Sequence, residues 1–332
     1  MSHWRQAERA SFDGRSRHQR RRRKPAWCGE SMRIVFNGRD LSAGQQPRFY
    51  TGLDRVGRLS YDGAMSEGAL CRREDLWVEV EGGRLAVRRL CPPARRADSE
   101  PIVLLHEGLG CIDLWRRFPE MLAEHARREV VLYDRLGHGR SQGVPVRRGI
   151  DYLHRAVEHE LTHLLEQLGI EHPTLLGHSD GGTMALLYGA KHDCTAIVTV
   201  AAHAAVEAEA LAGIRQTVER WRSTRLRKSL ERYHGDKAAR LFEDWSETWL
   251  AEWFREWSIF DELLTVRCPV LVVQGEDDEY ASRQHPLDIA ESLGGPARAE
   301  ILPGCGHSPH IQDPRRLLKR VARWLEVNDA RV

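Results

Sequence analysis

The sequence predicts an α/β fold: an eight-stranded, mostly parallel sheet covered by helices on both faces, with a helical cap inserted after the sixth strand. From about Leu76, short apolar runs rich in β-forming residues alternate with longer amphipathic stretches. The inner runs are apolar at nearly every position, which is typical of strands buried on both faces. The segment 204–263 is polar, has a helical pattern and interrupts this alternation, so we expect it to form the cap.

The predicted strands are short apolar runs, and the predicted helices are amphipathic stretches that follow them. The strands are 76–80, 84–88, 102–106, 130–133, 174–176, 196–200, 270–273 and 299–302. Gly82-Gly83 separates the first two and predicts a hairpin turn. Helical periodicity covers 113–127, 151–168, 181–191 and 314–327.

The N-terminal part differs in composition from the rest of the chain. Residues 1–64 contain 14 Lys or Arg and 6 Asp or Glu, including the run from Arg20 to Lys24, and show no periodicity. We therefore predict that 1–70 is a basic, disordered extension and that 71–330 is the folded domain. A solvated tail is favoured over a nucleic-acid-binding arm because no aromatic residues alternate with the basic ones. Met65 offers a later start, near which we expect the working protein to begin.

Composition limits the classes of partner. The 50 Lys and Arg nearly balance the 48 Asp and Glu, which gives no overall attraction to nucleic acid or to a membrane. The seven cysteines are scattered and lack a C-x-x-C pair, a pattern that fits a reducing compartment. No apolar stretch approaches the roughly 18 residues that span a bilayer. We expect a cytoplasmic protein with a small-molecule substrate, bound neither to nucleic acid nor to a membrane.

A predicted nucleophile lies where the fifth strand meets a helix. The segment Gly177-His178-Ser179-Asp180-Gly181 matches G-x-S-x-G, and it has the apolar strand before it and the helical stretch after it that this motif requires. The turn is so tight that small residues must flank the serine. We therefore predict that Ser179 is exposed at the N-terminus of the helix as a nucleophile.

A serine hydroxyl is a weak nucleophile until a base removes its proton, so a histidine and a carboxylate are expected downstream. The strand 270–273 leads into Glu276-Asp277-Asp278, of which Asp278 is the predicted acid, with Asp277 and Glu276 as alternatives. The strand 299–302 leads into a glycine-rich loop that presents His307, the predicted base, with His310 as the alternative.

The tetrahedral intermediate of such a reaction needs backbone N–H donors for its oxyanion. Asp180, the residue after the nucleophile, is expected to supply one. The second is expected from the glycine-rich loop after the third strand, where Gly108 and Leu109 are both possible donors. A turn without a catalytic role is the alternative for this loop.

A competing motif, His159-Glu160-Leu161-Thr162-His163, matches the H-E-x-x-H helix of zinc proteases. On a helix, however, both histidines point away from the apolar face of the same stretch and should face solvent. No further histidine follows at the spacing that would complete a zinc site. We therefore predict no metal site here.

Four tryptophans recur every fourth residue within the predicted cap: Trp245, Trp249, Trp253 and Trp257. On one helix their side chains would lie on one face. If half-buried, this stripe would line an apolar substrate pocket, with Trp249 and Trp253 as the predicted substrate contacts. The alternative, which is the commoner role of such stripes, is that it packs the cap onto the main domain.

Taken together, these motifs resemble the α/β-hydrolase superfamily, especially its capped carboxylesterase and carbon–carbon hydrolase branch. The resemblance covers about residues 75–328 and includes Tyr133-Asp134-Arg135-Leu136-Gly137-His138-Gly139-Arg140-Ser141, which looks like the structural D-x-x-G-x-G-x-S turn of that family. It implies the same roles for Ser179, Asp278 and His307. This chain departs from the family pattern at His106-Glu107-Gly108, where the usual pattern is His-Gly.

The resemblance and the motifs together predict a serine hydrolase that cleaves a carboxylic ester of a small or medium apolar substrate through an acyl-enzyme, without a metal or organic cofactor. A serine at position 179 argues against the branches whose resemblance implies an aspartate nucleophile. A carbon–carbon bond hydrolase and an acyltransferase would use the same three residues and remain alternatives. A non-catalytic binding protein is the least expected reading, because no member of the triad is missing.

Overall fold

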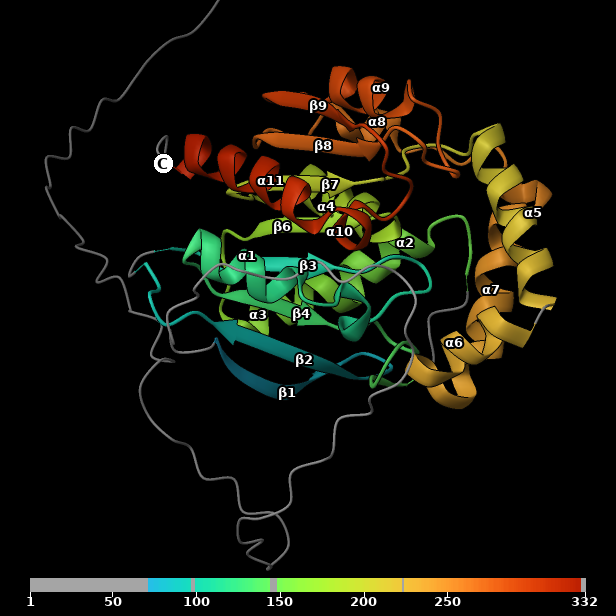
Figure 1. The fold of residues 1–332 in the computed structure, drawn as a ribbon, viewed down its shortest axis with the longest axis horizontal. Helices are drawn as coiled ribbons and strands as arrows, with labels where there is room; N and C mark the ends of the chain where they lie inside the picture. The colour runs from blue at the N-terminus through green and yellow to red at the C-terminus, as the bar shows by residue number, and fades with distance from the viewer. Residues whose placement is uncertain (1–70, 97–98, 144–147, 223, 330–332) are drawn as a thin grey trace, which may run out of the picture. The chain divides into compact units, whose positions relative to one another are not determined.

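The computed structural model describes residues 71–96, 99–143, 148–222 and 224–329, which are the coloured parts of Figure 1. They belong to one compact unit. The predicted N-terminal extension, residues 1–70, lies outside the described residues.

One mostly parallel sheet forms the centre of this unit. Its strands are β1 (Arg72–Val80), β2 (Gly83–Cys91), β3 (Ile102–Leu105), β4 (Val130–Tyr133), β5 (Gln142–Gly143), β6 (Thr174–His178), β7 (Ala196–Val200), β8 (Val270–Gly275) and β9 (Ala297–Leu302). Their order is β1-β2-β4-β3-β6-β7-β8-β9, and β5 pairs with β2. The strands from β4 to β9 along this order are parallel, whereas β1, β2 and β5 pair antiparallel. The predicted fold class is confirmed, and β5 is an addition to it.

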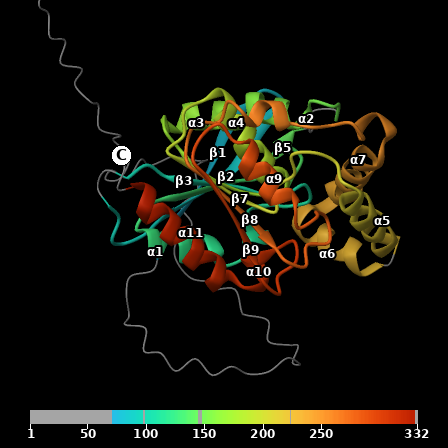
Figure 2. The same ribbon diagram turned by 90° about the horizontal axis from the view of Figure 1, so that it is seen from above.

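Helices cover both faces of the sheet, as Figure 2 shows. One face carries α1 (Phe118–Ala126) and α11 (Pro314–Asp329). The other carries α2 (Tyr152–Ala156), α3 (Thr162–Leu168) and α4 (Asp180–Lys191), with α9 (His285–Ser292) beside them. The short helix α8 (Phe260–Leu263) contacts α4 and α9. The inner strands are therefore shielded from water on two sides, which explains why β3 and β4 are apolar throughout, whereas β1 and β5 are mostly exposed.

The alternation of side chains along β3 shows how the two layers form. Ile102 and Leu104 pack with side chains of α1 and α11, whereas Val103 and Leu105 pack in the opposite cluster with side chains of α4. All four are at most 1% exposed. Burying an aliphatic side chain of this size contributes about 1.5–3 kcal/mol, so this one short strand supplies a substantial part of the core.

Of the helices that lie between β7 and β8, the longer ones are α5 (Ala208–Arg222), α6 (Thr224–His234) and α7 (Ala238–Leu250), called the inserted helices below. They gather at one end of the sheet in both ribbon views. They have a small apolar cluster of their own, in which the rings of Trp221 and Phe242 stack 4.1 Å apart. Within the described residues, no helix has both the length and the apolar character needed to cross a membrane.

Candidate active site

Ser179 lies in the turn between β6 and α4, and its backbone is strained. Its φ of 53° and ψ of −120° fall in a region that L-residues rarely adopt, at a cost of about 1–3 kcal/mol. A Cβ atom on Gly177 would lie 2.1 Å from the carbonyl oxygen of Gly181. One on Gly181 would lie 2.1 Å from the carbonyl oxygen of Leu105. Only glycine fits at positions 177 and 181, two residues before and after Ser179, which explains the glycines of the motif.

Asp278 and His307 follow β8 and β9, which are neighbours in the sheet. Nδ1 of His307 lies 2.9 and 3.1 Å from the two carboxylate oxygens of Asp278. Oδ1 of Asp278 also accepts the backbone N–H of Tyr280 at 2.9 Å. Because an ionised carboxylate only accepts hydrogen bonds, the imidazole proton lies on Nδ1, and Nε2 keeps a lone pair.

The pKa values of the two groups support this ionised pairing. Burial alone would raise the pKa of Asp278, but the charge and hydrogen bond of His307 hold it below its ordinary value. Burial alone would lower the pKa of His307, but the charge and hydrogen bond of Asp278 raise it above its ordinary value. An imidazolium at His307 is therefore stabilised by its partner.

The alternative acids and the alternative base lie in other surroundings. Glu276 forms an ion pair with Arg283 at 3.3 Å, and Asp277 is exposed. His310 is buried, with its ring centroid 4.6 Å from that of His178. Among the described residues, only the carboxylate of Asp278 is hydrogen-bonded to the imidazole of His307.

Ser179 and His307 line the same cavity, whose volume is about 300 Å³. Loops at the carboxyl ends of the strands form one wall of it with Gly108, Leu109, Asp180, His203, Glu279 and Tyr280. The inserted helices form the other wall with Ala210, Ile214, Thr217, Leu226, Leu230, Trp245 and Trp249. A mostly apolar wall thus faces a polar one, as in many small-molecule sites.

The carbonyl groups of the loop after β3 are bound by groups from two other segments, the turn after β4 and α6. Nη2 of Arg135 donates to the carbonyl oxygen of Glu107 at 2.9 Å. Nε2 of His138 lies 3.1 Å from the carbonyl oxygen of Gly108. Nε2 of His234, on α6, lies 3.0 Å from the carbonyl oxygen of Leu109. The loop is therefore fixed by hydrogen bonds to its backbone.

This arrangement decides where the N–H groups of the loop point. In a trans peptide the N–H points opposite to the carbonyl of the preceding residue. The N–H groups of Gly108 and Leu109 therefore point away from Arg135 and His138, and no acceptor among the described residues binds them. Of the two, Gly108 lies next to Asp180, since a Cβ atom on Gly108 would be 3.0 Å from Oδ2 of that residue.

Asp180 begins α4, where backbone N–H groups have no partner within the helix. Its side chain is buried, and Oδ2 accepts the hydroxyl of Tyr152 at 3.2 Å. Nη1 of Arg135 lies 3.7 Å from the same oxygen. Arg135 thus contacts both segments that were predicted to supply oxyanion donors, a role that its place in the sequence did not reveal.

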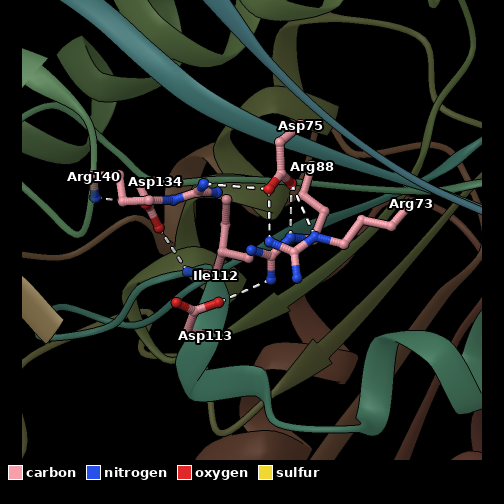
Figure 3. Close-up of polar contacts among 7 residues, drawn as sticks. All are labelled: Arg73, Asp75, Arg88, Ile112, Asp113, Asp134 and Arg140. Atoms are coloured by element: carbon pink, nitrogen blue, oxygen red, sulfur yellow. Dashed lines mark hydrogen bonds and ion pairs between the residues drawn. The ribbon is translucent and has the colours of Figure 1, made fainter. Parts of the chain in front are cut away.

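The turn after β4 is held by Asp134, as Figure 3 shows. Its Oδ1 accepts the backbone N–H of Ile112 at 2.6 Å and its Oδ2 accepts that of Arg140 at 2.8 Å. Its backbone carbonyl accepts the hydroxyl of Ser141 at 2.5 Å. None of these groups lines the cavity, so their contacts are structural, joining this turn to the end of the loop after β3.

A charge network ties the same turn to the N-terminal hairpin (Figure 3). The carboxylate of Asp75, on β1, forms ion pairs with Arg73 at 2.6 Å, Arg88 at 2.9 Å and Arg140 at 3.3 Å. Arg88 also bonds Asp113 at 2.8 Å. Burial alone would raise the pKa of Asp75, but its hydrogen bonds to Arg73 and Arg88 hold it well below its ordinary value.

The four tryptophans do not share one helix, contrary to the expectation. α7 ends at Leu250, and Ala251 is extended, with a φ of −68° and a ψ of 142°. Trp253 lies beyond this break, is 50% exposed and does not line the cavity. Trp249 lines the cavity, and its ring also packs 5.8 Å from that of Trp257 in the main core. A period of four residues could not reveal where the helix stops.

The H-E-x-x-H segment does not form a metal site. His159 is partly exposed and forms an ion pair with Glu81 at 2.9 Å, and His163 is exposed. Glu160 is buried and accepts the backbone N–H of Leu136 at 2.8 Å. In the parts of the chain that the structure describes, no three His, Cys, Asp or Glu side chains gather as a metal ion would require.

Sequence reasoning missed several polar residues of the cavity, of which His203 is an example. It follows β7 closely, is buried, and its ring centroid lies 5.9 Å from that of His307. Burial lowers the pKa of His203 to about 3, so its ring is neutral. Its position just after an apolar strand was the available signal, because the carboxyl ends of parallel strands meet at one edge.

A parallel sheet with a serine in a strained turn after β6, a carboxylate after β8 and a histidine after β9 is the arrangement of one enzyme class. The chain belongs to the α/β hydrolase family, whose model matches residues 102–320, and it is a hydrolase of that family.

Three relatives give the scale of the similarity. The chain is 24% identical over 275 residues to a proline iminopeptidase of Lactobacillus delbrueckii subsp. bulgaricus, an alignment that covers 70% of this chain and 92% of the relative. It is 30% identical over 244 residues to serine hydrolase BPHL of Mus musculus, with 71% and 80% covered. The crystal structure of a proline iminopeptidase from Mycobacterium smegmatis superposes with a TM-score of 0.60 at 21% identity, covering 77% of this chain and 99% of that one. This last likeness concerns the fold alone.

Proposed function

We propose that this chain is a carboxylic ester hydrolase that forms an acyl-enzyme on Ser179, with His307 as the base and Asp278 as its partner. The observation that carries the proposal is that a serine in a strained turn and a histidine bonded to a buried carboxylate line one cavity. A nucleophile, a base and a group that orients the base are the parts that acyl transfer needs.

The proposed reaction has two halves. In the first, Nε2 of His307 takes the proton of the Ser179 hydroxyl while its oxygen attacks the ester carbonyl. The imidazolium, stabilised by Asp278, then gives that proton to the leaving alcohol. In the second half, His307 takes a proton from water, the hydroxide attacks the acyl carbon, and the acid leaves as Ser179 regains its proton. The chain's own groups and water carry every step, so this reaction needs no metal ion or organic cofactor.

The N–H groups of Asp180 and Gly108 are the proposed donors to the oxyanion. Asp180 offers an N–H at the start of α4, and Gly108 offers one that points away from its bound carbonyl neighbour. The two residues lie next to each other at the cavity. Because both donors are held in place before the reaction, they can stabilise the oxyanion without reorganising.

We further propose that the inserted helices, within the segment 204–263, act as a cap that selects the acyl group. The inserted helices give the cavity leucine, isoleucine and tryptophan side chains, such as Ile214, Leu230 and Trp245. A cavity of about 300 Å³ is at the small end for ligand sites. A small or medium apolar acyl group fits both the volume and the lining.

A second activity is release of an N-terminal residue, which the names of the proline iminopeptidase relatives suggest. The same steps would serve, with an amine as the leaving group. The lining contains Glu107, Asp180 and Glu279, and no lysine or arginine is among the described lining residues, so a protonated amine could be accommodated. We prefer an ester substrate because the cavity wall formed by the inserted helices is mostly apolar.

Hydrolysis of p-nitrophenyl esters from acetate to decanoate tests the proposal. We expect a maximum at about four to six acyl carbons, unaffected by EDTA, and loss of activity in Ser179→Ala. Proline p-nitroanilide, run in parallel, tests the peptidase alternative. Activity that persists in Ser179→Ala would overturn the mechanism. Turnover of a vinylogous diketone, or of an ester only when an acceptor alcohol is added, would favour the carbon–carbon hydrolase or the acyltransferase instead.

A further inference from the structure

Glu107, where this loop departs from the family's His-Gly pattern, is paired with the residue before the nucleophile. Its Oε2 lies 3.3 Å from Nδ1 of His178, the last residue of β6. The His178 side chain is 1% exposed and that of Glu107 is 25% exposed. A Cβ atom on Gly110 would lie 2.4 Å from Oε2 of Glu107, so the glycine of this loop leaves space for the carboxylate.

The other nitrogen of His178 binds the loop that carries the base. Nε2 of His178 lies 2.8 Å from the backbone carbonyl oxygen of His307, and the two rings lie 5.0 Å apart. A carbonyl oxygen only accepts hydrogen bonds, so Nε2 must carry a proton. Nδ1 then faces a carboxylate oxygen, which also only accepts while it is ionised. Both contacts are hydrogen bonds at once only if Nδ1 carries a proton as well.

We propose that the carboxylate of Glu107 holds His178 as an imidazolium, whose Nε2–H binds the backbone carbonyl of His307 and positions this base toward Ser179. Both residues line the cavity, and in this proposal they act as positioning residues, through the backbone of His307 rather than on the reacting atoms. Their effect on turnover rests on the proposed function, whereas the charge on His178 can be measured without any substrate.

We assign the positive charge of this pair to His178 because the other histidines around it are neutral or bound to another carboxylate. The ring of His310, on α10 (Pro309–Gln312), lies 4.6 Å away, and burial lowers its pKa well below the ordinary value. His106 accepts the backbone N–H of Arg135 on Nε2, and burial lowers the pKa of His106 to about 3. His307 is the remaining neighbour, and its Nδ1 is bound to its own carboxylate.

The Glu107 side of the pair behaves as an ionised group. Burial alone would raise the pKa of Glu107, but the hydrogen bond and charge of His178 outweigh burial and hold it well below the usual range. An ionised Glu107 only accepts, so its hydrogen bond with Nδ1 of His178 requires a proton on that nitrogen.

Nitrogen-15 NMR of the histidine rings tests the charge directly, on the full-length protein at pH 7. We expect an imidazolium signal that disappears in His178→Asn, which assigns it, and that is replaced by a neutral imidazole in Glu107→Gln. The matched control Glu171→Gln, at an exposed position before β6, should leave the signal as it is. A neutral His178 in the wild-type protein would overturn the proposal, whatever the protein hydrolyses.

Kinetics with the best ester then test positioning. Glu107→Leu should lower kcat about 10- to 100-fold, the effect of losing a charge-assisted hydrogen bond, with KM changed less than about threefold. Glu107→Gln should recover most of that loss, because its amide can donate to Nδ1 and leave Nε2–H on the His307 carbonyl.

Thermal unfolding of both Glu107 variants separates positioning from misfolding. If Glu107→Gln is folded but as slow as Glu107→Leu, the positioning role is wrong. If no ester is hydrolysed by the wild type, the proposed function fails, and the NMR result still decides whether the charged pair exists.

Discussion

The packing of α4 against β3 at the nucleophile turn can be tested by replacing Gly181 with alanine. The new Cβ atom would lie 2.1 Å from the carbonyl oxygen of Leu105, 2.5 Å from its carbonyl carbon and 2.8 Å from the carbonyl oxygen of His106. Real contacts of this kind are at least 3.0 Å, so the helix and the strand must move apart by roughly 1 Å.

The size of the effect follows from what the new atom meets. Overpacking against side chains costs about 1–3 kcal/mol, and here the neighbours are backbone atoms that cannot rotate away. We therefore expect Gly181→Ala to lose at least about 3 kcal/mol of unfolding free energy, or about 6–12 °C in Tm for a domain of this size. A 1 Å displacement of Ser179 should also lower kcat of the folded fraction about 100-fold.

Gly169 offers a control glycine, at which an added Cβ atom would not clash with any neighbour. It has a φ of 66°, and a Cβ atom there would meet nothing within 4 Å. Gly169→Ala should therefore cost only the left-handed conformation, about 1 kcal/mol, and leave kcat as it is. Differential scanning calorimetry and ester hydrolysis measure both effects. Equal Tm losses in the two variants, or full kcat in Gly181→Ala, would refute the reasoning.

Three further predictions concern other parts of the site. Asp278→Asn should lower kcat about 10³- to 10⁴-fold, and a loss under tenfold would speak against its role. Because the pKa of His307 is raised above its ordinary value and the base must be neutral, kcat/KM should fall toward acid pH, and in Asp278→Asn this acid limb should move to lower pH. Trp249→Ala should cost about 3–5 kcal/mol in urea unfolding and Trp253→Ala less than about 1 kcal/mol, because the first is buried and the second half-exposed. Lys237→Met should lower Tm by at least about 4 °C, since its Nζ donates to three backbone carbonyls of the turn after β4, and an unchanged Tm would mean that these bonds contribute nothing.

The strands could be predicted from the sequence because a strand buried on both faces has apolar side chains at consecutive positions. The runs 130–133 and 196–200 are the observed strands β4 and β7 at both ends. The predicted helix 113–127 is instead two pieces, η1 (Ile112–Trp115) and α1, because Arg116 adopts a φ of 56° between them. Periodicity carries no information about a single left-handed residue. The two-residue strand β5 is likewise too short to have a period.

The residues at the ends of strands could be predicted, and the residues that hold them could not. Ser179, Asp278 and His307 each follow an apolar run at a carboxyl end, so topology alone brings them to one edge. Arg135 and His138 belong to a turn that sequence reasoning treated as structural, and only the folded chain shows that they bind the carbonyls of another loop. Such contacts depend on tertiary distance, which leaves no pattern along the chain.

His234 belongs to an inserted helix, yet both of its ring nitrogens serve the main domain. Nδ1 accepts the backbone N–H of Gly139 at 2.9 Å, and Nε2 binds the carbonyl of Leu109 at 3.0 Å. Insertions of this kind invite exchange between relatives as a way of moving substrate preference. A chimera that took α5–α7 from a donor without an equivalent imidazole would leave these two backbone groups of the main domain unpaired. A transplanted helix layer must therefore bring its own replacement for His234.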